Sequence, residues 1–190
     1  MARKAKIRIA LNDTRHIKQL KNEEIAKILR AADEIIGKAG RAMLVKILKG
    51  SKDKKVLEHA LDQCPSYGYY SQMKMADIEV LVDWMIKHNY LKISYDGRLP
   101  MIVFTDYGWE VYKPIFAEEM LNKIISVPSD GEEALVEEFR TVNREVINLI
   151  LDQIIEQKLS DTISFLEKWK IKAYKKDANK INYTIRKLQN

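Results

Sequence analysis

The sequence contains little of the chemistry on which most enzymes and secreted proteins rely. Its 190 residues include one cysteine, three histidines, seven glycines and four prolines. The single Cys64 excludes an internal disulfide and every multi-cysteine zinc site, and it is typical of a protein from a reducing compartment. His16, His59 and His88 are scattered, and none lies at ligand spacing from another His, Cys or carboxylate. We therefore expect no metal and no other cofactor.

Long apolar runs and local catalytic motifs are also missing. No run approaches the length of about 18 residues that a membrane-spanning helix needs, and no apolar segment follows the basic N-terminus as in a secretory signal. Gly50-Ser51-Lys52 has neither the residue order nor the preceding strand of a phosphate loop, and nothing similar to G-x-S-x-G occurs. We expect a cytoplasmic protein that is not an enzyme and has no membrane partner.

Positive charge is concentrated in the first third of the chain. The formal net charge is +6, and residues 1–60 hold 16 Lys and Arg against 7 Asp and Glu. Such a distribution indicates an acidic partner for this region, of which nucleic acid is the most common. A second lysine cluster near the C-terminus is either a solvated helix face or an extension of the same surface: Lys168, Lys170, Lys172, Lys175, Lys176 and Lys180.

The run from Leu48 to Leu57 contradicts a rule of helix electrostatics. Gly50 is expected to end one helix as a left-handed cap, and Ser51 to begin the next as its N-cap. A helix N-terminus is partly positive and favours acidic residues, yet its first turn here holds Lys52, Lys54 and Lys55. The pattern predicts either a phosphate site or a solvated lysine-rich turn.

The periodicity predicts four helical segments and then a hairpin, and the last three segments with the hairpin lie within the expected winged helix. Apolar stripes run through 22–36, 43–48 and 76–88, with a shorter helix beginning at Ser51. Two β-prone runs, 90–95 and 101–105, flank Asp96-Gly97, a strong hairpin signal. This order is that of a winged helix-turn-helix. Beyond Pro114 we expect helices at about 132–141, 146–155, 161–169 and 173–188.

The predicted fold class is mainly α. It combines an α+β winged helix-turn-helix, whose wing is a β-hairpin, with an all-α antiparallel helical region similar to HEAT hairpins. We expect a basic N-terminal arm and helix over 1–39, the winged helix over 40–113 and the helical region over 114–190.

Three groups of residues carry a family resemblance. Gly40-Arg41, the run Leu48-Lys49-Gly50-Ser51-Lys52 and the pattern Thr105-x-x-Gly108 after the wing occur in the order found in the RecQ C-terminal (RQC) domain. That domain is the winged-helix module of RecQ-family DNA helicases, and the match covers about 40–113. The chain most resembles the stand-alone bacterial proteins of the minor RQC family, which bind DNA.

The resemblance implies a DNA partner, with expected roles in DNA repair or replication. In the family, the turn before the second wing-domain helix contacts phosphates and the hairpin acts as a wedge at the terminal base pair. Carried over, the Gly-Arg opening contributes Arg41, the turn contributes Lys49, Ser51, Lys52, Lys54 and Lys55, and the wing contributes Tyr95, Arg98 and Leu99. The wing is short, with Leu99-Pro100 where some relatives have an aromatic residue or a histidine, so its ability to separate strands is open.

The third wing-domain helix offers an independent argument. Asp77, Glu79 and Asp83 are expected to point outward and repel phosphates, which disfavours insertion of this helix into the major groove. Trp84 is expected to pack on the C-terminal helices. We therefore predict a non-enzymatic protein that recognises DNA backbone or structure, as a duplex or a fork junction. A sequence-specific winged-helix transcription regulator and a protein-interaction adaptor are the alternatives. The C-terminal helices could hold a protein partner.

Overall fold

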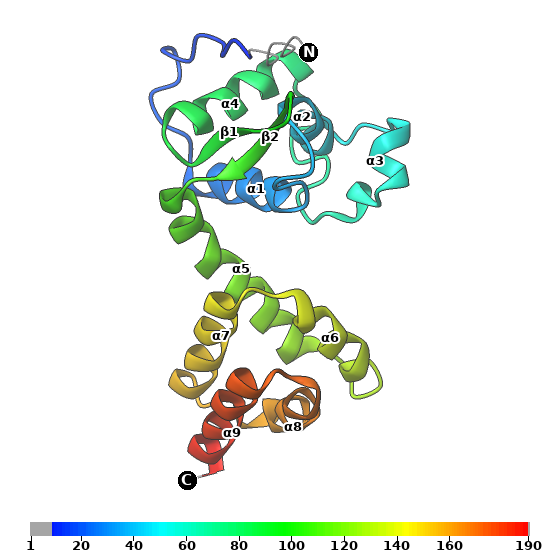
Figure 1. The fold of residues 1–190 in the computed structure, drawn as a ribbon, viewed down its shortest axis with the longest axis vertical. Coiled ribbons are helices and arrows are strands. Elements are labelled where there is room, and N and C mark those ends of the chain that lie inside the picture. The colour runs from blue at the N-terminus through cyan, green and yellow to red at the C-terminus, as the bar shows by residue number, and fades with distance from the viewer. Residues whose placement is uncertain (1–8, 190) are drawn as a thin grey trace. The chain divides into compact units, whose positions relative to one another are not determined.

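The chain divides into two compact units, Met1–Tyr112 and Lys113–Asn190. The computed structural model describes residues 9–189, so the first eight residues of the predicted N-terminal arm lie outside the described part (Figure 1). The predicted mainly α fold, with a winged helix followed by a helical region, is confirmed. The subdivision of the first unit at residue 40 stays a prediction.

The first unit has the order of a winged helix. Its hairpin strands pair antiparallel from Leu91 opposite Phe104 to Asp96 opposite Leu99, so that Gly97 and Arg98 form the loop. Gly97 has φ 57°, as the tight hairpin turns require at that position. The elements are α1 (Asn22–Asp33), α2 (Arg41–Lys49), α3 (Lys54–Glu58), the short 3₁₀-helix η1 (Leu61–Gln63), α4 (Met75–Lys87), β1 (Leu91–Asp96) and β2 (Leu99–Phe104).

The apolar stripes seen in the sequence form the core of this unit. Helix α2 packs against α1 and α4, and the inner side of the hairpin covers the same core. Each fully buried aliphatic side chain stabilises the fold by about 1.5–3 kcal/mol relative to its exposed state. The side chains with no exposed surface include Ile28, Leu29, Leu44, Ile47, Leu48, Val56, Ile78, Val82, Met85 and Ile102.

Thr105 and Gly108 join the wing to helix α5 (Asp106–Ser126). The Thr105 hydroxyl accepts a hydrogen bond from the Gly108 N–H at 2.9 Å and also bonds to the Asn89 carbonyl, so it caps the helix while holding the chain before β1. A Cβ on Gly108 would lie 1.8 Å from the carbonyl oxygen of Tyr90, a distance that no side chain permits. The Thr-x-x-Gly pattern thus has a structural cause.

Helix α5 is not among the individual helices that the sequence predicted. It begins at Asp106 and continues through Pro114, although the expected boundary between regions lay at that proline. Proline removes one backbone hydrogen bond inside a helix, and here the helix tolerates that loss because Pro114 is exposed. The division between the two units falls within α5.

Helix α7 (Arg144–Glu156) contributes an apolar face to the core of the second unit. The prediction that this strongly apolar helix must be covered is confirmed, because Val146, Ile150 and Ile154 have no exposed surface. Phe139, Phe165 and Trp169 form an aromatic cluster with centroid separations of 4.5–5.9 Å. The similarity to HEAT hairpins stays a prediction. The other elements are α6 (Glu132–Glu138), η2 (Phe139–Thr141), η3 (Ser160–Thr162), α8 (Ile163–Lys172) and α9 (Lys175–Gln189).

Candidate nucleic-acid interface

The turn after α2 is held in place by its backbone. Gly50 adopts the predicted left-handed conformation, with φ 73° and ψ 41°, and its N–H and that of Ser51 bond to the last carbonyls of α2. A Cβ on Gly50 would lie 3.0 Å from the Cα of Gly68, so two glycines allow the turn and the loop before α4 to touch. The Tyr67 hydroxyl donates to the Ser51 carbonyl at 3.2 Å. The turn therefore presents its side chains from a fixed backbone.

The prediction that Ser51 caps the following helix is wrong. Helix α3 begins at Lys54 and is five residues long, and its N-cap is Asp53, whose carboxylate accepts the Lys55 N–H at 3.0 Å. The Ser51 hydroxyl instead accepts the Asp53 N–H at 3.3 Å. A hydrogen bond from Lys46, with a second from the Lys55 backbone, holds the pKa of Asp53 below its usual value. The N-terminus of α3 is thus already capped by a carboxylate.

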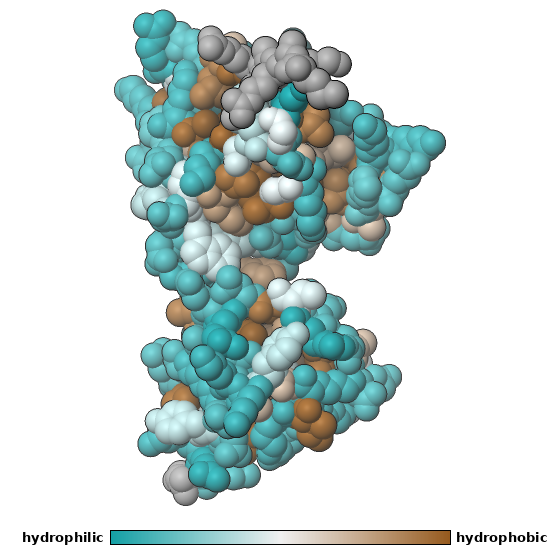
Figure 2. Space-filling model, in the orientation of Figure 1, coloured by the Kyte–Doolittle hydropathy of each residue, from teal (hydrophilic) through white to brown (hydrophobic). Residues whose placement is uncertain are grey.

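The lysine side chains around this cap remain turned to solvent. Lys52, Lys54 and Lys55 are exposed, and Figure 2 shows the projecting α3 region as largely hydrophilic. Lys54 lies 3.4 Å from Glu58 in a solvent-exposed pair, which at such exposure is worth little. Within residues 9–189 the ammonium groups of Lys52 and Lys55 have no hydrogen bond or ion pair. The turn therefore presents the ammonium groups of Lys52 and Lys55 to solvent without an ion-pair partner among the described residues.

Two residues of the predicted interface have structural partners. The Lys49 ammonium donates to the carbonyls of Ser71 and Met73, the latter at 2.9 Å, and so holds the loop before α4. The Arg41 guanidinium is 14% exposed and lies 2.7 Å from Glu79 and 2.6 Å from Asp83. Contacts of either residue with DNA stay predictions. The charge of Arg41 is already balanced inside the fold.

Asp83 does not point outward, and this prediction is wrong. Its side chain is 0% exposed, and its carboxylate receives the Asn12 backbone N–H at 2.7 Å and side-chain amide at 2.8 Å in addition to Arg41. Asp77 is exposed as expected, and Glu79 is partly exposed. Periodicity alone could not show that an acidic position off the apolar stripe would be covered by a distant segment.

The covering segment is the N-terminal segment, defined as residues 9–20, which carried no clear period in the sequence. It runs beside α4 (dark blue in Figure 1). Besides the contacts of Asn12, the Trp84 indole donates to the Ile17 carbonyl at 3.2 Å and Lys87 donates to the Asn12 carbonyl at 2.6 Å. Trp84 therefore packs within the first unit, where the sequence had suggested the C-terminal helices. The N-terminal segment thus covers the C-terminal half of α4 at Asp83, Trp84 and Lys87.

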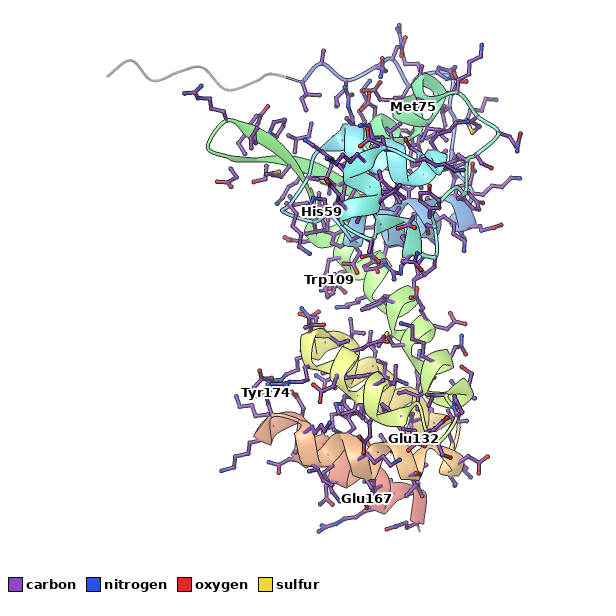
Figure 3. The ribbon with its side chains drawn as sticks, turned by 90° about the vertical axis from the view of Figure 1, so that its right-hand side faces the viewer. His59, Met75, Trp109, Glu132, Glu167 and Tyr174 are labelled. Atoms are coloured by element: carbon purple, nitrogen blue, oxygen red, sulfur yellow. The ribbon has the colours of Figure 1, made fainter. Side chains whose placement is uncertain are left out.

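The wing brings the remaining predicted residues together. Tyr95 is partly buried and pairs with Pro100 across the hairpin, while Arg98 and Leu99 are exposed at the tip, Leu99 by 57%. Figure 3 shows the hairpin projecting from the first unit, with α3 beside it facing the viewer. The proposed contacts thus fall into two groups. We call residues 49–55 the lysine turn and residues 95–99 the wing tip.

Cys64 is buried, with its sulfur accepting the Ser66 N–H at 3.4 Å, and residues 9–189 hold no group of His, Cys, Asp or Glu suited to a metal ion. None of the helices described is long and apolar enough to cross a membrane.

The order of its helices and the two-stranded hairpin define the first unit as a winged-helix domain. The model of the RQC domain matches residues 21–122, more than half of the chain, and the chain belongs to this family. The ATP-dependent DNA helicase RecQ of Bacillus subtilis is 25% identical over 107 residues, which make up 56% of this chain. The chain spans only 18% of that helicase. No solved structure matches the chain.

Proposed function

We propose that this protein binds DNA through the backbone and the shape of the duplex or fork, using the lysine turn and the wing, and that it has no catalytic activity of its own. The observation that carries the proposal is the pair of exposed ammonium groups of Lys52 and Lys55, which form no ion pair within residues 9–189, beside a fixed turn in a domain of the RQC family. Its relative is named as a DNA helicase, and duplex DNA offers the regular array of phosphates that such a turn fits.

The spacing of the two groups supports contact with separate backbones. The lysine turn follows the C-terminus of α2, and Gly40 at its N-terminus lies against Pro100 of the wing, where a Cβ would come within 2.5 Å of the Pro100 carbonyl oxygen. A helix of nine residues is about 13 Å long at the standard rise, similar to the width of the B-DNA major groove of about 12 Å. The length of α2 therefore separates the lysine turn from the wing by about the width of one major groove.

The covered face of α4 argues for backbone recognition over base readout. A winged helix that reads sequence presents polar side chains of its third helix to base edges. Here Asn12 and Ile17 bond to that helix, and Asp83 and Glu79 bind Arg41. Phosphate contacts position a protein without selecting sequence. A transcription regulator specific for one palindrome would have to displace the N-terminal segment.

Fluorescence anisotropy with forked, blunt duplex and single-stranded DNA of matched sequence tests the proposal. We expect tighter binding to the forked and blunt duplexes than to the single strand, and the same affinity when the base sequence is scrambled. Equal affinity for all three forms, or none below about 100 µM, the weak end of non-specific binding, would contradict it. Strong preference for one duplex sequence would favour the regulator, and indifference to all DNA would favour the adaptor.

A further inference from the structure

The first unit has a second cationic feature, a pocket beside the wing. The pocket has a volume of about 460 Å³ and lies between the turn after α1, the middle of α2, and α3 with η1. It is within the size range of small-molecule sites, about 300–1,000 Å³. The residues that line it are Glu34, Ile35, Lys38, Ala39, Met43, Lys55, His59 and Leu61.

The floor of the pocket is apolar and its rim is basic. Ile35 and Leu61 are buried in the floor, beside Met43, whose thioether is suited to contact with an aromatic ring. Lys38, Lys55 and His59 lie on the rim and are exposed. In the part of the chain that the structure describes, none of these three side chains has a hydrogen bond or an ion pair. Glu34, the one acidic residue that lines the pocket, is bound by Arg30 at 2.7 Å.

The position of the pocket connects it to the wing. The Gly37 N–H donates to the Ile102 carbonyl and the Ile102 N–H donates to the Ala39 carbonyl, both at 2.9 Å, so the turn that lines the pocket is bonded to β2. Ile102 lies three residues from Leu99 at the tip, a distance of about 10 Å along a strand. His59, another residue of the lining, is labelled in Figure 3. DNA that contacts the wing tip, as proposed, would therefore lie about 10 Å from the strand residue to which the lining turn is bonded.

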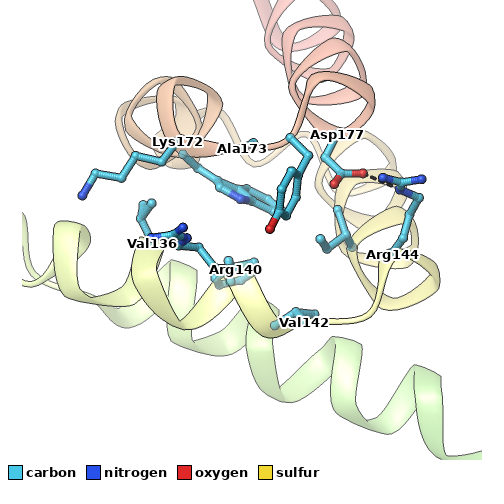
Figure 4. Close-up of a pocket in the computed structure, with 11 residues that line it drawn as sticks. Val136, Arg140, Val142, Arg144, Lys172, Ala173 and Asp177 are labelled. Carbon is cyan, nitrogen blue, oxygen red and sulfur yellow. Dashed lines mark hydrogen bonds and ion pairs between the residues drawn. The ribbon is translucent and has the colours of Figure 1, made fainter.

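A pocket in the second unit differs from this one because its basic side chains are paired with carboxylates. That pocket, of about 190 Å³ (Figure 4), is lined by basic residues too, and in addition by aromatic residues. There Arg144 lies 2.8 Å from Asp177, and Glu137 binds both Lys172 at 2.8 Å and Arg140 at 3.2 Å. Its positive charges are neutralised within the fold, so an anion would have to compete with carboxylates. In the pocket beside the wing, the one lining carboxylate, Glu34, is bound by Arg30, and among the described residues no carboxylate is paired with Lys38, Lys55 or His59.

We infer that the pocket beside the wing takes one unpaired nucleotide, with the base on Ile35, Met43 and Leu61 and the phosphate on Lys38, Lys55 and His59. This inference rests on the proposed function and deepens it, because it assigns a separate site to the unpaired base beside the duplex of a fork. An apolar floor suits the flat face of any base, and unneutralised cations suit the phosphate that comes with it. The site is therefore expected to accept all four bases.

The experiment compares a fork with a blunt duplex of the same sequence, each bound to the full chain. Stacking of one base is worth about 1–3 kcal/mol, so we expect the fork to bind roughly 5 to 150 times more tightly. The variant K38A/H59A removes two exposed rim groups and leaves the lysine turn intact. It should reduce the preference for the fork by at least about threefold, while its affinity for the blunt duplex stays within about twofold. The matched control is H16A/K18A, which removes the same residue types from the N-terminal segment and should keep the preference.

A photo-crosslink identifies the occupant directly. With 4-thiothymidine at the first unpaired position of the fork, we expect crosslinks to residues between Glu34 and Leu61, found by mass spectrometry and lost on competition with unlabelled fork. Crosslinks confined to the wing, or a preference for the fork that K38A/H59A leaves unchanged, would overturn the inference while the proposed function stands. Absence of any DNA binding by the wild-type chain would instead overturn the proposed function itself.

Discussion

The guanidinium of Arg41 lies 2.6 Å from the carboxylate of Asp83, a side chain with no exposed surface. Arg41 is the first residue of α2, and Asp83 lies in the second half of α4. Asn12 of the N-terminal segment bonds to the same carboxylate. Breaking a buried ion pair leaves one charge in a poorly hydrated site and typically costs about 3–5 kcal/mol. This pair therefore joins three separate parts of the first unit.

We expect Asp83→Ala to lower the free energy of unfolding by about 3–5 kcal/mol, because it leaves Arg41 without its buried partner. Urea denaturation followed by circular dichroism measures this. The double variant R41A/D83A should lose less than the sum of the two single losses, since neither charge is then unpaired. The exposed pair Lys54 and Glu58 provides the control, where K54A should change stability by less than about 0.5 kcal/mol. Additive losses in the double variant would contradict a coupled pair.

Charge reversal at Lys52 should weaken binding to every duplex in equal measure. Each phosphate contact contributes about 0.9 to the slope of log K against log salt, so K52E should flatten that slope by about one unit. Titrations at several salt concentrations provide the slope. Lys18 in the N-terminal segment is also exposed and serves as the control, since K18E changes the net charge by the same amount at a residue outside the turn. Equal effects of the two substitutions would indicate a general charge effect and no local contact.

The wing tip should contribute to binding without contributing to stability. Leu99 is 57% exposed and Arg98 is exposed, so R98A/L99A should leave the melting temperature within about 2 °C of the wild type. We expect a loss in affinity for forked DNA of about 5- to 20-fold, the effect of losing one stacking or phosphate contact. Anisotropy on the fork measures it. A variant that melts earlier but binds normally would assign the tip a structural role.

The link between the wing and α5 should be intolerant of substitution. Gly108→Ala places a Cβ 1.8 Å from the Tyr90 carbonyl oxygen, so we expect a loss of about 3 kcal/mol or more. Thr105→Val removes the helix cap and should cost about 1 kcal/mol, whereas T105S keeps the hydroxyl and should restore most of it. Thermal and urea unfolding measure these differences. A stable G108A variant would mean that the close approach is relieved by a backbone shift.

The stability of the first unit should fall at strongly alkaline pH. Burial, with the hydrogen bond to Tyr107, raises the pKa of Tyr90 to about 12, above the value near 10 of a free tyrosine. The neutral phenol is therefore favoured by folding, and its contribution is complete below pH 10 and is lost as the pH rises through 12. We expect Y90F to show a smaller loss of stability between these values. Denaturation at a series of pH values tests this, with an unchanged profile in Y90F counting against it.

Local sequence patterns were sufficient for most of the fold. The stripes of α1, α2, α4 and α7 predicted helices because apolar residues three and four positions apart must share one buried face. Gly50 and Asp96-Gly97 predicted a left-handed cap and a hairpin because these conformations are governed by the residues themselves. The start of α5 was missed, because Pro114 indicated a boundary between regions, whereas the helix begins at Asp106 and continues through that proline.

The predicted interface depended more on distant contacts. Sequence spacing brought out the lysines at 52, 54 and 55, which are exposed as expected. It could not show that Asp53 caps α3, because Ser51 and Asp53 are both good N-caps and the choice depends on Lys46 one helix earlier. The pocket beside the wing gave no local signal, since Lys38, Met43 and His59 come from three separate elements.

The sequence by itself determined that this chain is helical, carries a hairpin wing and concentrates its positive charge before residue 60, because periodicity, turn chemistry and charge are local properties. The tertiary structure decided which charges are available. Arg41 and Lys49 bind carboxylates and carbonyls far along the chain, whereas Lys52 and Lys55 do not. An ion pair depends on the distance between side chains after folding, and sequence separation does not give that distance.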